Sequence, residues 1–174
     1  MHQLASTIRN VPDFPKKGIV FRDITTLLKD PHAFNSAVQI FYDRYKHEQI
    51  DKVVCIESRG FILGSALAAK LGAGFVPVRK GGKLPAEKYQ EEYILEYGTD
   101  VLEIHKDALK PGEKVLLHDD LLATGGTMLA ASKLVERLGG KIIGLSFLIE
   151  LSFLNGKEKV GGYDVFSVIQ YDSE

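Results

Sequence analysis

The sequence is poor in cysteine and tryptophan: it has one cysteine and no tryptophan among 174 residues. A single cysteine excludes an intramolecular disulfide framework. Cys55 lies in the apolar run 53–56, where we expect a small buried side chain in a reducing compartment. The five histidines show no metal-ligand spacing, so a zinc site made by protein side chains alone is not expected.

Excess charge and long apolar helices are also absent. With 22 basic and 23 acidic residues, the chain offers no electrostatic case for a nucleic-acid or membrane-surface partner. Residues 61–78 are mostly apolar, but Lys70 interrupts them, and Gly72, Gly74 and Pro77 break their helical character. A helix followed by a strand is therefore expected there. Because the N-terminus also lacks the apolar core of a signal peptide, we expect a soluble, cytoplasmic protein.

Two common nucleotide-binding fingerprints are missing. Neither GxxxxGK[ST] nor GxGxxG occurs, which argues against a P-loop ATPase and against a dinucleotide-binding protein. The length and the 45% of hydrophobic residues suit one domain, residues 1–174, with a sizeable core.

The strongest functional signal lies in residues 114–128, KVLLHDDLLATGGTM. Residues 114–118 predict a short buried strand that ends at Asp119 and Asp120, and a helix is predicted to follow. The free N–H groups and the dipole at a helix N-terminus favour an anion such as phosphate. The turn that would hold it is Ala123, Thr124, Gly125, Gly126 and Thr127.

The two carboxylates make this signal more specific. Asp119 and Asp120 would repel a bound anion unless sugar hydroxyls or a divalent cation took up their charge. A ligand with both a phosphate and a vicinal diol is a ribose 5-phosphate. The alternative is that the pair forms a helix cap and a solvated turn.

Predicted strands alternate with predicted helices along the chain, which indicates a mostly parallel sheet with helices on both faces. Ligands of such sheets bind at the carboxyl ends of the strands, where we expect Arg59, Arg79, Asp119 and Glu150 to converge. The strands are predicted at 52–57, 74–79, 114–118, 141–149 and 163–171.

Two further segments suggest anion binding. The turn 57–60, Glu-Ser-Arg-Gly, either holds a second anion through Arg59 and its amides or is an ordinary solvated connection. The stretch 79–85, RKGGKLP, carries Arg79, Lys80 and Lys83. Such a charge run is often just solvated, but a ligand with three phosphate groups would need this much positive charge.

The remaining segments carry weaker signals. A short helix within 1–10 is followed by residues 11–18, whose prolines and glycine argue against regular structure, so this segment is either packing or a lid. A helix is expected to begin at Pro31 with Asp30 as its cap. Residues 89–104 read as an antiparallel ribbon of mixed polarity, which we expect to stand clear of the core and to move.

The segment DDLLATGGTM resembles the phosphoribosyl-pyrophosphate motif of the type I phosphoribosyltransferases, and DLLATGGT resembles the adenine phosphoribosyltransferases in particular. The likeness extends over nearly the whole chain. It includes PDFPKKGIVFRDIT (base-covering segment), ESRGF (pyrophosphate loop), VRKGGKLP (basic stretch), LEYG (mobile loop) and IEL (base pocket).

This resemblance implies an α/β fold with a mostly parallel twisted sheet, a small N-terminal hood at about 1–30 and a mobile loop at about 80–106. It also implies formation of AMP and pyrophosphate from adenine and phosphoribosyl pyrophosphate. Mg²⁺ would be bound mainly by the substrate, and the chain would form a homodimer.

The resemblance also assigns residue roles. The turn 123–127 would hold the 5-phosphate, and Asp119 and Asp120 the ribose. The pyrophosphate residues would be Ser58, Arg59, Gly60, Arg79, Lys80 and Lys83, and the adenine residues Val20, Phe21, Arg22 and Leu151.

For catalysis, the resemblance implies Glu96 as the acid/base and Tyr97 as its loop neighbour, with Glu150 as the competing carboxylate. Glu57 stands where aspartate is expected in some members. We expect this departure to matter little, because the position would act through its backbone. Two other functions stay open: transfer to another base, such as hypoxanthine or guanine, and a non-catalytic regulator that senses the same ligand. The regulator would need a nucleic-acid surface that the composition does not provide.

Overall fold

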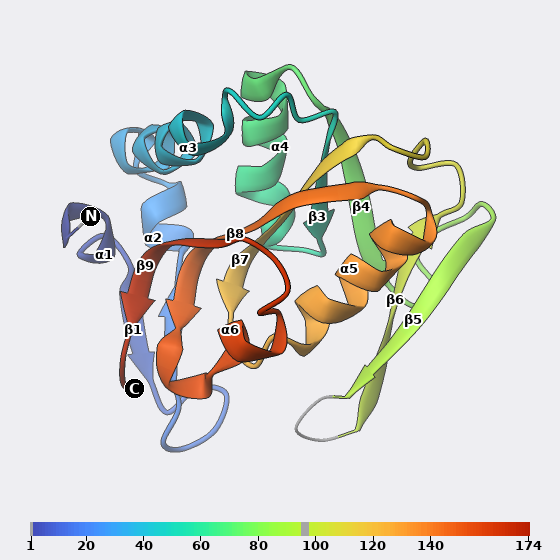
Figure 1. Cartoon of the computed structure of the whole chain (residues 1–174). Coiled ribbons are helices and arrows are strands. Elements are labelled where there is room, and N and C mark those ends of the chain that lie inside the picture. Colours follow the sequence, from blue (N-terminus) through green and yellow to red (C-terminus); the bar gives the residue numbers. More distant parts are fainter. Residues whose placement is uncertain (1, 95–97) are drawn as a thin grey trace.

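The computed structural model describes residues 2–94 and 98–174. Within them, the main sheet has seven strands in the order β5-β6-β4-β3-β7-β8-β9 (Figure 1). These are β3 Lys52–Ile56, β4 Gly74–Lys80, β5 Lys88–Ile94, β6 Thr99–His105, β7 Lys114–Leu122, β8 Lys141–Leu151 and β9 Val165–Tyr171. The strands β4, β3, β7, β8 and β9 run parallel, while β6 is antiparallel to β4 and β5 is antiparallel to β6. The predicted mostly parallel sheet is confirmed.

Helices cover both faces of this sheet (Figure 1). On one face lie α3 (Pro31–Tyr45) and α4 (Gly60–Leu71), and on the other lies α5 (Gly126–Arg137). The predicted start of α3 is confirmed, because Asp30 accepts hydrogen bonds from the backbone N–H groups of His32 and Ala33. Gly72 ends α4 in the left-handed conformation, as its sequence position suggested.

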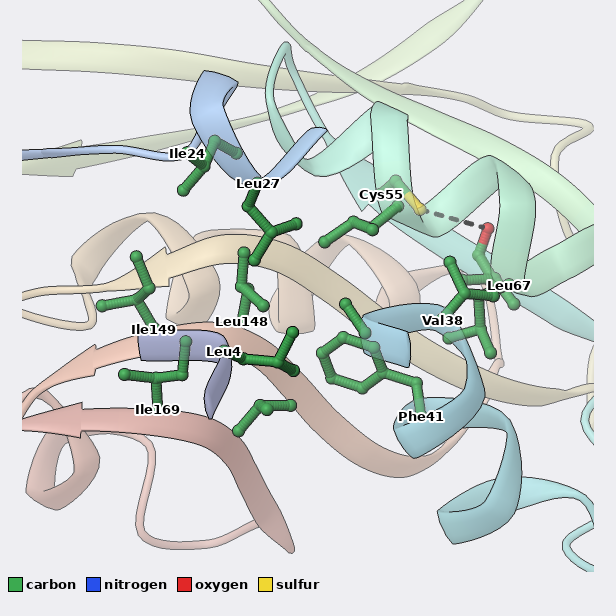
Figure 2. Close-up of a cluster of buried hydrophobic side chains, with 14 of the residues drawn as sticks. Leu4, Ile24, Leu27, Val38, Phe41, Cys55, Leu67, Leu148, Ile149 and Ile169 are labelled. Atoms are coloured by element: carbon green, nitrogen blue, oxygen red, sulfur yellow. Dashed lines mark hydrogen bonds between the residues drawn. The ribbon is translucent and has the colours of Figure 1, made fainter. Parts of the chain in front are cut away.

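Alternate strand residues face two separate cores. In β3, Cys55 joins the core beneath α3 and α4, while Val54 joins the core beneath α5. Figure 2 shows the first core, where Phe41 and Val38 of α3 meet Leu67 of α4. The burial of Cys55 confirms its predicted place as a small core side chain.

Two central strands run further than the sequence suggested. The ladder between β7 and β8 continues past residue 118, with Asp119 opposite Phe147 and Leu122 opposite Glu150. Asp119 and Asp120 therefore lie within β7, and the prediction that they follow the strand is wrong. Pairing with β8 keeps this acidic segment extended, which local propensity did not reveal.

The ribbon formed by β5 and β6 does not stand clear of the core, so that prediction is wrong. Tyr93, Leu102 and Ile104 are buried beneath α5. The reason is that β6 pairs with the end of β4, Lys80 lying opposite Leu102, which makes the ribbon an extension of the main sheet. The mobility expected of residues 80–106 stays a prediction.

The N-terminal part is more regular than predicted. After the short α1 (His2–Ala5), β1 (Arg9–Pro12) pairs antiparallel with β2 (Val20–Asp23), and the α2 turn Thr25–Leu28 follows. Two short turns follow β8, η1 Ser152–Leu154 and α6 Gly156–Lys159. Within residues 2–94 and 98–174, no helix is both long and apolar enough to cross a membrane.

Candidate active site

A cavity of about 440 Å³ opens where β3 and β7 end and α5 begins, at the carboxyl edge of the parallel strands. It brings together residues from five separate parts of the chain. They are Ile56, Glu57, Ser58, Arg59, Lys80, Tyr93, Leu102, Asp119, Asp120, Leu121, Leu122, Ala123, Thr124, Gly125, Thr127 and Met128.

The turn 123–127 forms the end of the cavity at the N-terminus of α5. Gly125 is the N-cap residue and adopts φ +79°, a conformation that L side chains rarely take. A Cβ atom there would lie 2.5 Å from the carbonyl oxygen of Gly156 in α6. The turn therefore packs against α6, and its backbone N–H groups and the helix dipole make it suited to a phosphate.

Asp119 and Asp120 both line the cavity, beside the turn. Arg59 Nε donates a hydrogen bond to Asp120 Oδ2 at 2.6 Å, and the Asp120 backbone N–H donates to Asp119 Oδ1 at 2.8 Å. Burial and the neighbouring Asp120 charge raise the pKa of Asp119 well above its ordinary value. The pair faces the cavity and does not cap a helix, which favours the ribose-binding alternative.

The turn 57–60 leads directly from β3 into α4. Ser58 and Arg59 line the cavity. Gly60 lies behind them, because a Cβ atom on it would approach Asp119 Oδ1 to 2.8 Å. The turn packs so closely against β7 at this point that a side chain on residue 60 would clash with Asp119.

The side chain of Glu57 makes several contacts with the basic stretch 79–85. Its carboxylate accepts hydrogen bonds from Arg79 Nε at 3.2 Å, Arg79 Nη2 at 3.3 Å and the Lys80 backbone N–H at 3.0 Å, and it also pairs with Lys83 Nζ. Burial alone would raise the pKa of Glu57, but the donors from Lys83 and Arg79 hold it at about 2. The expectation that this position acts mainly through its backbone is wrong.

A second carboxylate holds the remaining cation of the basic stretch. Lys80 Nζ lies 3.1 Å from Asp100 Oδ2, and Tyr93 Oη donates to the same oxygen at 3.2 Å. Lys80 and Tyr93 both line the cavity, and burial raises the pKa of Tyr93 to about 12. Sequence reasoning missed Tyr93 and Asp100. They lie opposite each other where β5 pairs with β6, and this contact depends on the register between the two strands.

The predicted adenine residues lie outside this cavity lining. The ring centroid of Phe21 in β2 lies 5.3 Å from Arg59 Cζ, in the turn 57–60. The Val20 backbone N–H donates to Glu174 Oε2, and the Arg22 guanidinium lies 4.0 Å over the Tyr171 ring. Leu151 packs at the edge of the core beneath α3. Their role in holding adenine stays a prediction.

The candidate acid/base residues are Glu96, with its neighbour Tyr97, and the competing Glu150. Glu96 and Tyr97 lie outside the described residues. Glu150 is buried in β8, where its Oε2 accepts a hydrogen bond from Gln170 Nε2 at 3.1 Å. Glu150 does not belong to the cavity lining given above, so its predicted convergence on this cleft is not observed.

Comparison with known proteins places this arrangement in a family. The phosphoribosyl transferase domain matches residues 23–171 of the chain. The adenine phosphoribosyltransferase of Halothermothrix orenii is 58% identical over 168 residues, which cover 97% of this chain and 99% of that protein.

Solved structures agree. The crystal structure of adenine phosphoribosyltransferase from Thermoanaerobacter pseudethanolicus has a TM-score of 0.95 at 53% identity and covers 98% of this chain and 99% of that one. The enzyme from Saccharomyces cerevisiae, in complex with adenine and an imino-altritol bisphosphate, has a TM-score of 0.92 at 40% identity, with 96% and 97% covered.

Proposed function

The chain belongs to the adenine phosphoribosyltransferase family, and from this membership we propose that it transfers the 5-phosphoribosyl group of phosphoribosyl pyrophosphate to adenine, giving AMP and pyrophosphate. Such a reaction serves purine salvage. One observation carries the proposal: a single cavity joins three groups of residues. They are the turn 123–127 at the start of α5 (the helix-start turn), Asp119 and Asp120 of β7, and the turn 57–60 that carries Arg59 (the Arg59 turn). These groups suit a 5-phosphate, a ribose diol and a pyrophosphate in that order.

The reaction needs both ends of the substrate to be fixed. We propose that the turn 123–127 binds the 5-phosphate, Asp119 and Asp120 bind the ribose hydroxyls, and Ser58 to Gly60 bind pyrophosphate with Arg79, Lys80 and Lys83. Held in this way, the anomeric carbon faces the attacking nitrogen of adenine. The new C–N bond forms as the C–O bond to pyrophosphate breaks, and the bonding electrons leave on the pyrophosphate oxygen.

Cations favour this step because negative charge gathers on the departing pyrophosphate. The cavity fits Mg²⁺, a cation that prefers oxygen ligands, because it presents the carboxylates of Asp119 and Asp120 next to the space for a phosphorylated sugar. When bound, mainly through the substrate, Mg²⁺ adds further positive charge near the leaving group.

The base is proposed to lie against the strand β2, with Val20, Phe21 and Arg22 on one side and Leu151 on the other. The contact between Arg59 and Phe21 supports this, because it places the ring of Phe21 beside the pyrophosphate turn. We propose Glu96 as the group that takes the imidazole proton of adenine, with Tyr97 beside it. Closure of residues 80–106 would then exclude water, which otherwise hydrolyses the activated sugar.

We also propose that the chain acts in the cytoplasm as a homodimer. The thiol of buried Cys55 is free, which suits a reducing compartment. Two large apolar side chains, Ile62 of α4 and Phe75 of β4, are 41% and 38% exposed, and Phe75 packs edge-to-face on Phe61. Sedimentation of the parent and of Ile62→Glu tests this surface, since a dimer that uses it should dissociate in the variant.

The activity is tested by incubating the protein with Mg²⁺, phosphoribosyl pyrophosphate and each of adenine, hypoxanthine, guanine and uracil, while pyrophosphate release is followed. We expect rapid release with adenine and far slower release with the others. Equal rates with hypoxanthine would contradict adenine specificity. Binding of phosphoribosyl pyrophosphate without turnover of any base would indicate a ligand-sensing regulator.

A further inference from the structure

The carboxylate of Glu57 connects two segments that the proposed function uses for one ligand. Glu57 is the last residue before the Ser58–Gly60 turn, and its side chain is only 9% exposed. Its partners, Arg79, Lys80 and Lys83, come from the basic stretch 22 to 26 residues further along the chain.

The basic stretch would be hard to fix without such an anchor. Residues 81–87 contain no helix or strand, and Gly82 adopts φ +81°. A segment with two adjacent glycines has many accessible backbone conformations, so holding Lys83 in one place beside Arg79 of β4 requires contacts from outside the segment. Glu57 supplies such contacts from the end of the rigid, buried strand β3.

The cations keep donors for a ligand while they pair with Glu57. Arg79 has five N–H donors and Lys83 has three, and only some of them point at Glu57. Arg79 and Lys83 are 35% and 45% exposed, whereas Glu57 is nearly buried. Glu57 and Lys80 line the cavity described above, while Arg79 and Lys83 are outside that lining and connect to it through Glu57. We expect a bound anion at this edge of the cavity to meet the exposed donors of both cations without displacing Glu57.

We propose that Glu57 is a positioning residue: it holds Arg79 and Lys83 in the arrangement that binds the pyrophosphate group of the substrate, and its bond from the Lys80 backbone N–H fixes the carboxylate itself. The proposal rests on the proposed function only in taking pyrophosphate as the ligand. Glu57 acts through the cations and does not itself contact the reacting atoms.

An opposite reading makes Glu57 a competitor, because a carboxylate beside cations also reduces the positive charge that an anion experiences. The two readings differ in the sign of one measurement. If Glu57 positions the cations, Glu57→Gln weakens pyrophosphate binding. If it competes with the ligand, the same substitution strengthens binding.

The direct experiment is calorimetric titration of Mg²⁺-pyrophosphate into the parent protein and into Glu57→Gln, each shown to be folded by circular dichroism. We expect the dissociation constant to rise about tenfold in Glu57→Gln, roughly the worth of one charge-assisted hydrogen bond. Glu57→Asp keeps the charge and should recover most of the affinity. Glu87→Gln is the matched control: its carboxylate pairs with Lys106, and its side chain is 82% exposed, so binding should not change.

Steady-state kinetics give a second readout that a general loss of stability would not produce. The KM for phosphoribosyl pyrophosphate should rise about tenfold in Glu57→Gln, and the KM for adenine should stay within twofold. In a Lys83→Gln background, Glu57→Gln should have a much smaller effect, because one of the cations that it holds is gone. If Glu57→Gln does not fold, Glu57→Asp and Lys83→Gln can still be compared with Glu87→Gln.

Unchanged or tighter pyrophosphate binding in folded Glu57→Gln would overturn the proposal, and so would additive effects in the double variant. Failure of the proposed function would look different. In that case the parent protein would not turn over adenine, while the calorimetric comparison would still show whether Glu57 organises an anion site.

Discussion

Arg59 and Asp120, which are 61 residues apart in sequence, share a hydrogen bond of 2.6 Å that joins the turn after β3 to the strand β7. Asp120 is nearly buried at 7% exposure, while Arg59 is 42% exposed. The bond ties the proposed pyrophosphate site to the proposed ribose site, so that one ligand can bridge two elements already held together.

Asp120→Asn should therefore weaken binding at both sites. It removes a charged acceptor for the ribose and the charged partner of Arg59. We expect the KM for phosphoribosyl pyrophosphate to rise roughly ten- to hundredfold, with a much smaller change for adenine. Asp43→Asn, which removes an exposed partner of Lys46, is the control. Equal effects on both substrates would mean that Asp120 supports the fold and not the ribose site.

Asp119→Asn should stabilise the protein at neutral pH while impairing ligand binding. Burial and the Asp120 charge raise the folded-state pKa of Asp119 above the ordinary value of 3.8. The folded state then binds more protons than the unfolded state, so this group lowers stability as pH rises above about 3.8. In denaturant unfolding at pH 5 to 8, the free energy of unfolding of the variant should increase relative to that of the parent as pH rises. A variant less stable than the parent throughout this range would contradict the assignment.

His118 gives the opposite pH dependence. Its ring is buried beside Phe41, its Nδ1 lies 3.0 Å from Ser146 Oγ, and burial lowers its pKa to about 4. Below pH 6.5 the unfolded state takes up a proton that the folded state resists, so stability falls as pH drops from 6.5 to about 4. This loss is on the order of 3 kcal/mol, and His118→Asn should lack it.

Local signals predicted much of the fold, and contacts between distant segments account for the rest. The cap at Asp30, the end of α4 at Gly72 and the helix-start turn 123–127 depend on neighbouring residues, and all were identified from sequence. The extension of β7 through Leu122 depends on pairing with β8, which propensity does not encode.

The candidate site divides in the same way. The residues of the helix-start turn, the aspartate pair and the Arg59 turn follow directly from motifs, and the cavity brings them together. The partners of the basic stretch were missed: Glu57 pairs with it directly, and Asp100 pairs with Lys80 while accepting a hydrogen bond from Tyr93. Each of these contacts joins different elements, so it cannot be predicted from a local sequence pattern.

Gly125→Ala should damage the helix-start turn even before any ligand binds. The positive φ disfavours a side chain, and the added Cβ would lie 2.5 Å from the Gly156 carbonyl oxygen. We expect a loss of roughly 2–4 kcal/mol in unfolding free energy, along with weaker binding of phosphoribosyl pyrophosphate. Gly112→Ala separates the two causes, since Gly112 has φ +86° but no heavy atom within 4 Å of the added Cβ. A similar loss in both variants would show that backbone strain alone matters.

Glu96→Gln tests the proposed proton transfer against the competing residue Glu150. The amide keeps the shape of the side chain but cannot take up the imidazole proton, so kcat should fall roughly 10²- to 10⁴-fold. Glu150→Gln should leave kcat within a few-fold, because Glu150 is buried in β8 beside Gln170 and outside the cavity lining described here. Its effect should appear as a lower midpoint of thermal unfolding.

The two variants are compared best by single-turnover measurements with saturating phosphoribosyl pyrophosphate, which isolate the chemical step from product release. The pH dependence of the rate adds a second readout: the fall in rate at low pH that protonation of Glu96 produces in the parent should disappear in Glu96→Gln and persist in Glu150→Gln. If Glu96→Gln turns over within a few-fold of the parent while Glu150→Gln does not, the proton transfer belongs to Glu150. The buried carboxylate of β8 would then have to reach the base from outside the cavity that joins the other site residues.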